Sequence, residues 1–177
     1  MANEYDDVLQ REIVTTRVFD APREMVFEAW TDPEKLEHWY APDGCTIKYK
    51  SIEVKQGGRF HYYIHHPLHG GAWVLGTYVE ILPPQKLSFT IQLSNENGDI
   101  IHKSADGQPT TWPGEILTTV TFESIGNQTK ATIHEAVSEE KARQTGAYKG
   151  WIEMFNKLND QLTAHAAAMT RTSTRLK

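Results

Sequence analysis

The feature that most constrains the fold is a long amphipathic segment near the end of the chain, residues 138–169, which Ser138 can cap. Its apolar residues recur at steps of three and four, a spacing that places them on one stripe of a helix. They are Tyr148, Trp151, Phe155, Leu158 and Leu162. The segment follows a series of strand-like stretches, and this order predicts a sheet that grips one long helix with a cavity between them.

Segments that alternate apolar and polar residues make up most of the chain before that helix. We expect strands over residues 12–19, 46–54, 59–65, 73–82, 86–93, 116–123 and 130–135. Two short helices follow the first strand: Pro22 marks the start of one, and Thr31 with Glu34 has the spacing of a capping box at the start of the other. The order predicts an α+β domain, with an antiparallel sheet that carries its helices on one side.

Charge and cysteine content argue against several functional classes. The formal net charge is -5, so neither nucleic acid nor an anionic membrane surface would be attracted over long range. No apolar run is long enough to span a bilayer, and the acidic, polar residues 1–11 do not have the pattern of a signal peptide. Cys45 is the only cysteine, which fits a reducing compartment. We therefore expect a cytoplasmic protein with no nucleic-acid or membrane partner.

A series of short motifs runs through nearly the whole chain. The longest is RVFDAPREMVFEAWTDPEKL over residues 17–36, followed by Trp39 and Pro42. The others are GGRF (57–60), GTYVE (76–80), PPQKLSFT (83–90), TTVTF (118–122), TKATI (129–133) and GW (150–151). In this order the motifs resemble the heat-shock-protein-90 ATPase activator homologues, which belong to the START-like, helix-grip (SRPBCC) superfamily. The resemblance covers about residues 11–164.

The resemblance implies a curved antiparallel sheet of six or seven strands wrapped around a long C-terminal helix, with two short helices after the first strand. We expect a single domain at residues 11–166 with flexible tails at 1–10 and 167–177. Members of the superfamily include co-chaperone domains, ligand carriers and polyketide cyclase-like enzymes. The shared motifs are mostly fold residues and specify no reaction, so the function has to be argued from the site.

Strand alternation assigns one set of side chains to the concave side of the sheet, facing the long helix. These side chains would line an apolar cavity with a few polar groups, the makeup of a small-molecule site. The alternative is that the aromatic side chains fill the interior. The candidate ligand-binding residues are Phe60, Tyr62, Ile64, Tyr78, Phe89, Trp112, Glu135, Trp151, Phe155 and Leu158. Trp112 would close the cavity mouth from the long polar connection at 95–114, unless that connection is a hairpin with one packed aromatic.

The function that these residues favour is non-catalytic binding of a small, largely apolar molecule, with no cofactor, by a monomer or homodimer. Two alternatives stay open. One is a protein-interaction domain of the chaperone-activator kind. The other is a cyclase- or hydrolase-like enzyme on bulky apolar substrates, with His61 or Glu135 as acid or base.

Histidines form the one cluster with metal-binding chemistry. They are His61, His65, His66 and His69. Imidazoles are common zinc ligands, but neither a His-Glu-x-x-His nor a Cys-x-x-Cys pattern accompanies them, and residues 65–71 have the composition of a solvated hairpin loop. We therefore expect no metal site.

Overall fold

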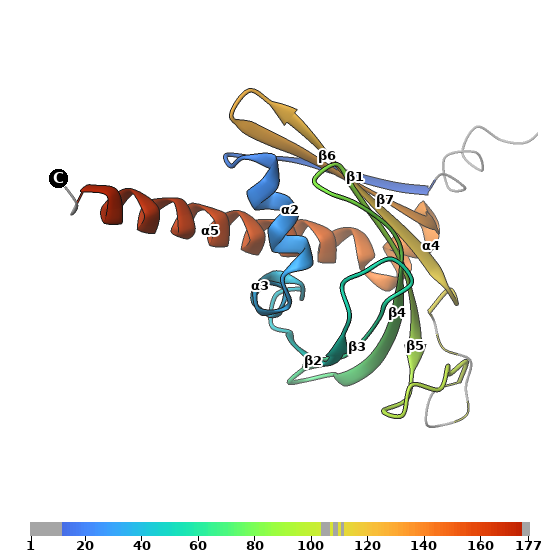
Figure 1. Ribbon diagram of the computed structural model, residues 1–177. Coiled ribbons are helices and arrows are strands. Elements are labelled where there is room, and N and C mark those ends of the chain that lie inside the picture. Colours follow the sequence, from blue (N-terminus) through green and yellow to red (C-terminus); the bar gives the residue numbers. More distant parts are fainter. Residues whose placement is uncertain (1–11, 104–106, 108–109, 111, 175–177) are drawn as a thin grey trace, which may run out of the picture.

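The computed structural model describes residues 12–103, 107, 110 and 112–174, with side chains described through residue 168. In this part of the chain seven strands form one antiparallel sheet in the order β1-β7-β6-β5-β4-β3-β2. The sheet curves around the start of helix α5, and helices α2 and α3 lie beside α5 (Figure 1). The expected α+β architecture, a curved sheet wrapped around a C-terminal helix, is confirmed.

The elements agree closely with the predicted segments. The strands are β1 (Glu12–Phe19), β2 (Thr46–Ile52), β3 (Arg59–His66), β4 (Gly70–Leu82), β5 (Lys86–Ser94), β6 (Ile116–Ile125) and β7 (Gln128–Ser138). The helices are α2 (Arg23–Thr31), α3 (Pro33–Trp39), α4 (Glu139–Thr145) and α5 (Ala147–Thr174).

Alternation along the strands places the core on the concave side of the sheet. On β7 Ala131, Ile133 and Glu135 are all buried, whereas His134 between them is exposed. On the neighbouring strand β6, Thr118 pairs with Glu135, so its side chain lies on the same face of the sheet. Because side chains alternate between the two faces with a period of two, the register fixes the face of each residue wherever a strand has no bulge, as along the β6–β7 pair.

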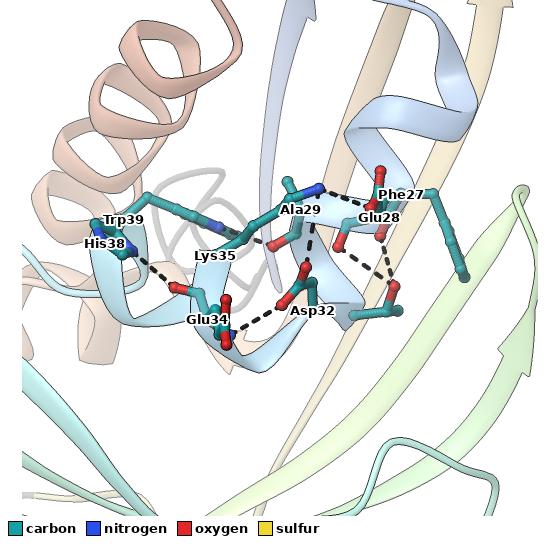
Figure 2. Close-up of polar contacts among 9 residues, drawn as sticks. Phe27, Glu28, Ala29, Asp32, Glu34, Lys35, His38 and Trp39 are labelled. Carbon is teal, nitrogen blue, oxygen red and sulfur yellow. Dashed lines mark hydrogen bonds and ion pairs between the residues drawn. The ribbon is translucent and has the colours of Figure 1, made fainter. Parts of the chain in front are cut away.

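The two short helices are joined at Asp32 (Figure 2). Its carboxylate accepts the N–H of Glu34 at 2.9 Å, and Pro33 is the first residue of α3. The predicted capping box at Thr31 is wrong. Thr31 still belongs to α2, so its hydroxyl donates to the carbonyl of Phe27 at 3.1 Å instead of capping α3.

Trp39 at the end of α3 fixes this helix to α2. Its indole N–H donates to the carbonyl of Ala29 at 3.0 Å, as Figure 2 shows, and its side chain is fully buried. The ring of Trp30 packs on it, with 4.7 Å between centroids. This anchoring sets the position of the next residue, Tyr40, which lines the cavity described below.

The predicted single C-terminal helix is divided into two helices, which meet at Gly146. Gly146 has φ of 74°, the left-handed conformation that glycine adopts readily, and its N–H donates to the carbonyls of Ala142 and Arg143. Ser138 caps α4 as expected, since its side chain accepts the N–H of Lys141 at 3.3 Å. The long amphipathic segment is therefore α4 followed by α5.

The far end of α5 extends past the sheet (Figure 1). It continues to Thr174, beyond residue 166 where the sequence places the end of the domain. The N-terminal tail predicted at residues 1–10 lies outside the described residues. No helix in the described part of the chain has both the length and the apolar character needed to cross a membrane.

Candidate functional site

A cavity of about 400 Å³ lies between the concave face of the sheet and the junction of α4 with α5. Its walls come from strands β3 to β7, from the segments that follow α3 and precede β6, and from the first turns of α5. A volume of this size is in the range of pockets that hold small organic molecules.

Five of the ten predicted site residues line this cavity. They are Tyr62, Ile64, Trp112, Glu135 and Trp151. They come from two strands, from α5 and from the segment before β6, so the curvature of the sheet brings together residues far apart in the sequence. Trp112 lines the cavity wall, but part of the 95–114 connection, from which it was predicted to close the cavity mouth, is outside the described residues.

The other five predicted residues lie elsewhere in the core. Phe60, Tyr78 and Phe89 line a separate cavity of about 10 Å³, which has room for about one water molecule. Phe155 and Leu158 line neither space. The ring of Phe155, one turn along α5 from Trp151, packs edge-on against Phe19 with 5.4 Å between ring centroids. These five residues support the wall and the helix and do not face the larger cavity.

Several lining residues were not among the predicted ones. Tyr40 and Pro42 come from the connection between α3 and β2, which has no periodic pattern that could have identified them. The strand residues continue the concave face and could have been found from the period of two. They are Ala72, Val74, Ile91, Leu93, Ile116 and Val137. The remainder are Pro113, Thr145, Gly146, Ala147, Gly150 and Met154.

Glu135 is the polar centre of the cavity and is only 4% exposed. The Thr118 hydroxyl donates to its Oε1 at 3.3 Å, and the Trp151 indole N–H donates to the same carboxyl group. Burial raises the pKa of Glu135, and the two neutral donors offset part of that effect because they stabilise the ionised form. Among the described residues that line the cavity, Glu135 is the only Asp, Glu, Lys, Arg or His.

Tyr40, from the connection between α3 and β2, and Tyr62 on β3 supply two further polar groups. The rings of Tyr40 and Tyr62 meet edge to face, with 6.2 Å between centroids. Burial raises the pKa of both phenols, and the nearby negative charge of Glu135 raises it further. Both hydroxyls are therefore neutral at physiological pH and able to donate or accept a hydrogen bond.

His61 lies on the opposite face of β3, away from the cavity. Its Nε2 is 3.1 Å from the Ser94 hydroxyl and 3.2 Å from the Asn95 carbonyl oxygen, and its ring packs on Trp73. Burial lowers the pKa of His61, and the hydrogen bond to Asn95 opposes that effect. The alternation along β3 points His61 to the side of the sheet opposite the cavity, so this position does not favour the alternative in which His61 acts as an acid or base on a ligand there.

The predicted histidine cluster does not assemble into a metal site in the part of the chain that the structure describes. There, no three His, Cys, Asp or Glu side chains lie close enough together to hold a metal ion. His66 and His69 stack at 4.5 Å between ring centroids, whereas His61 is held at Ser94.

The comparisons with known proteins agree with this architecture. The model of the family described as activator of Hsp90 ATPase homolog 1-like protein matches residues 20–163. No curated protein matches the chain at a significant level.

Several solved structures share the fold. A protein from Arthrobacter aurescens has a TM-score of 0.74 and 24% identity, with 89% of this chain and 88% of that chain covered. A protein from Chromobacterium violaceum has a TM-score of 0.71 and 22% identity, with coverages of 85% and 96%. The AHSA1 protein from Silicibacter pomeroyi has a TM-score of 0.68 and 17% identity, with coverages of 88% and 99%. At these identities the likeness is one of fold alone.

Proposed function

The chain belongs to the family of activator of Hsp90 ATPase homolog 1-like proteins, and from this premise we propose that it binds a small, largely apolar molecule in the cavity between the sheet and α5, without catalysing a reaction. The observation that carries the proposal is a cavity of about 400 Å³ with an apolar lining and a few convergent polar groups. Protein interiors are otherwise close-packed, with few voids larger than a water molecule. A space of this size therefore favours a ligand over a filled core.

The lining residues have two roles: some offer apolar contact surface to a ligand, and others offer hydrogen-bonding groups. Trp151 and Trp112 offer flat aromatic surface, and Ile64 offers an aliphatic wall. Glu135 and Tyr62 are the groups that would orient the ligand by hydrogen bonds. We further propose that the protein works in the cytoplasm, a reducing compartment, in keeping with its single cysteine, Cys45. We also propose that it binds the ligand without a cofactor.

Native mass spectrometry of the purified protein, followed by extraction of any bound mass, tests the proposal. We expect a stoichiometric small molecule of low polarity. The variant Ala72→Trp would fill the cavity from β4, because Ala72 is a lining residue, and should remove that mass. Ala136→Trp is the matched control, since Ala136 is exposed on the opposite face of β7 and the bound mass should persist. A ligand retained by both variants would contradict the proposal.

The family description favours a second candidate, a domain that activates a chaperone ATPase. Strand β1 forms one edge of the sheet and exposes Val14 and Val18, at 53% and 46%, so an apolar surface for a protein partner exists there. An ATPase assay with the chaperone of the same organism tests this role. Stimulation that survives Ala72→Trp but is lost in a double variant of Val14 and Val18 to Ser would favour it over ligand binding.

The enzymatic alternative has less support. It relied on His61 or Glu135 as acid or base, and His61 is on the other face of the sheet. Glu135 alone would have to provide both proton donation and proton removal.

A further inference from the structure

The charge of the cavity identifies the chemical class of ligand that it favours, an inference that rests on the proposed function. Glu135 is the only lining residue, among those described, that can carry a full charge at neutral pH. Its hydrogen-bond donors, Thr118 and Trp151, are both neutral. The carboxyl group therefore has no cationic partner from the described residues around it.

Helix ends at the cavity do not replace such a partner. The first residues of α5 line the cavity, and a helix N-terminus carries a partial positive charge. However, α4 ends at Thr145 and α5 begins at Ala147, with only Gly146 between them, so the partial negative end of one helix lies next to the partial positive end of the other. The two opposite charges largely cancel at this point.

Aromatic rings surround the same space. The Tyr40 ring lies 5.8 Å from the Trp151 ring and 6.2 Å from the Tyr62 ring, measured between centroids. All three side chains line the cavity with Glu135. Aromatic faces attract cations through the ring quadrupole, and the attraction is stronger where water is excluded. They give no comparable attraction to an anion.

We propose that the cavity selects an apolar molecule whose polar group is a basic nitrogen, held by Glu135 among the rings of Tyr62 and Trp151. The protonated amine would donate to the free acceptor positions of the carboxylate, which has about four lone-pair sites and two donors in the protein. A carboxylate ligand would instead bring a second negative charge next to Glu135, in a space with no lysine or arginine among its described lining residues.

Three probes with one apolar skeleton test the proposal: 4-phenylbutylamine, 4-phenyl-1-butanol and 4-phenylbutanoate, titrated into the full chain by calorimetry. We expect the amine to bind about tenfold more tightly than the alcohol, and the carboxylate to bind most weakly. Glu135→Gln should abolish the tenfold preference and leave the affinity for the alcohol nearly unchanged. Tyr62→Phe keeps the carboxyl group and the ring face, so the amine preference should persist.

The outcomes separate this inference from the proposed function. If the alcohol binds but the amine binds no better, or if the carboxylate binds most tightly, the inference fails and the proposed cavity ligand stands. If none of the probes binds the wild-type protein at millimolar concentration, both fail. An amine preference that is unchanged in Glu135→Gln would also overturn the inference. Glu123→Gln controls for net charge, because Glu123 is an exposed residue of β6 that does not line the cavity.

Discussion

The Glu135 carboxyl group on β7 accepts a hydrogen bond from the indole N–H of Trp151 on α5. This contact joins the sheet to the helix at the wall of the cavity. The same carboxyl group is thus a structural acceptor in the folded protein and, among the described residues that line the cavity, the only side chain that can carry a full charge at neutral pH. The two roles can be separated by changing the charge and keeping the acceptor.

Glu135→Gln makes that separation and predicts a change in the pH dependence of stability. Burial raises the pKa of Glu135 above 4.5, so the folded state binds this proton more tightly than the unfolded state. The resulting stabilisation is fully present below pH 4.5 and is lost as the pH rises through the folded pKa. The unfolding free energy of the variant, relative to wild type, should therefore increase with pH above 4.5, as measured by urea titrations at a series of pH values.

The surface variant Glu123→Gln serves as the comparison. Its partner is Lys130 at 3.2 Å in an exposed ion pair, which contributes about 1 kcal/mol or less. Equal pH profiles for wild type and Glu135→Gln would show that the carboxyl group is not desolvated.

His61 predicts a pH dependence of the opposite sign. Burial lowers its pKa below 6.5, so the unfolded state takes up the proton first as the pH falls. The folded protein should lose stability between pH 6.5 and the lower folded pKa, and His61→Gln should remove that part of the loss. Denaturant titrations of both proteins across this window test the prediction. If His61→Gln lost as much stability as wild type over this pH range, groups other than His61 would be responsible for the loss.

Much of the fold could be predicted because several strands, β7 most clearly, alternate buried and exposed residues with a period of two. The burial of Ala131, Ile133 and Glu135 on one face follows directly from that pattern. The break at Gly146 was missed because the apolar stripe begins only at Tyr148, and periodicity does not report a backbone turn. The cap of α3 was placed one residue early, although Pro33 at the first helical position favours Asp32.

The site was harder to predict than the core, because a helical stripe shows that a residue is buried but not what it faces. Trp151 and Phe155 belong to one stripe, yet only Trp151 reaches the cavity and Phe155 packs on Phe19. Tyr40 and Pro42 line the cavity from a connection, where position depends on the anchoring of α3 by tertiary contacts and not on local sequence.

Replacement of glycine by alanine should have opposite effects on stability at two positions, Gly76 and Gly150. A Cβ on Gly76 would overlap the Phe60 ring, its cross-strand neighbour, and would also meet the Thr90 carbonyl oxygen at 2.6 Å. Gly76→Ala should destabilise the fold by about 1–3 kcal/mol, the usual range for overpacking. A Cβ on Gly150 in α5 would meet only Pro42, with Cγ at 3.4 Å. Gly150→Ala should stabilise the protein by about 0.5–1 kcal/mol through helix propensity.

Thermal unfolding of the two glycine variants checks both signs. A Gly76→Ala protein as stable as wild type would mean that the Phe60 ring moves aside without cost. Destabilisation by Gly150→Ala would mean that the contact with Pro42 is tighter than the structure indicates.

Replacing Leu158 and Ile64 by alanine should lower the free energy of unfolding by different amounts. We expect the larger loss at Leu158 in the core and the smaller loss at Ile64 in the cavity wall. Leu158 is fully buried on α5 and lines neither of the two cavities described above, so Leu158→Ala should leave a new void and cost about 2–5 kcal/mol. Ile64 already borders open space and is half-buried, so Ile64→Ala should enlarge the cavity at a cost of about 1 kcal/mol. Denaturant titrations give the two costs, and probe titrations give the second readout. Ile64→Ala should change the affinity for 4-phenyl-1-butanol, whereas Leu158→Ala, under conditions where it stays folded, should not. Equal losses of unfolding free energy in the two variants would mean that the space beside Ile64 is closed in solution. That result would contradict the proposal that the larger cavity binds a ligand.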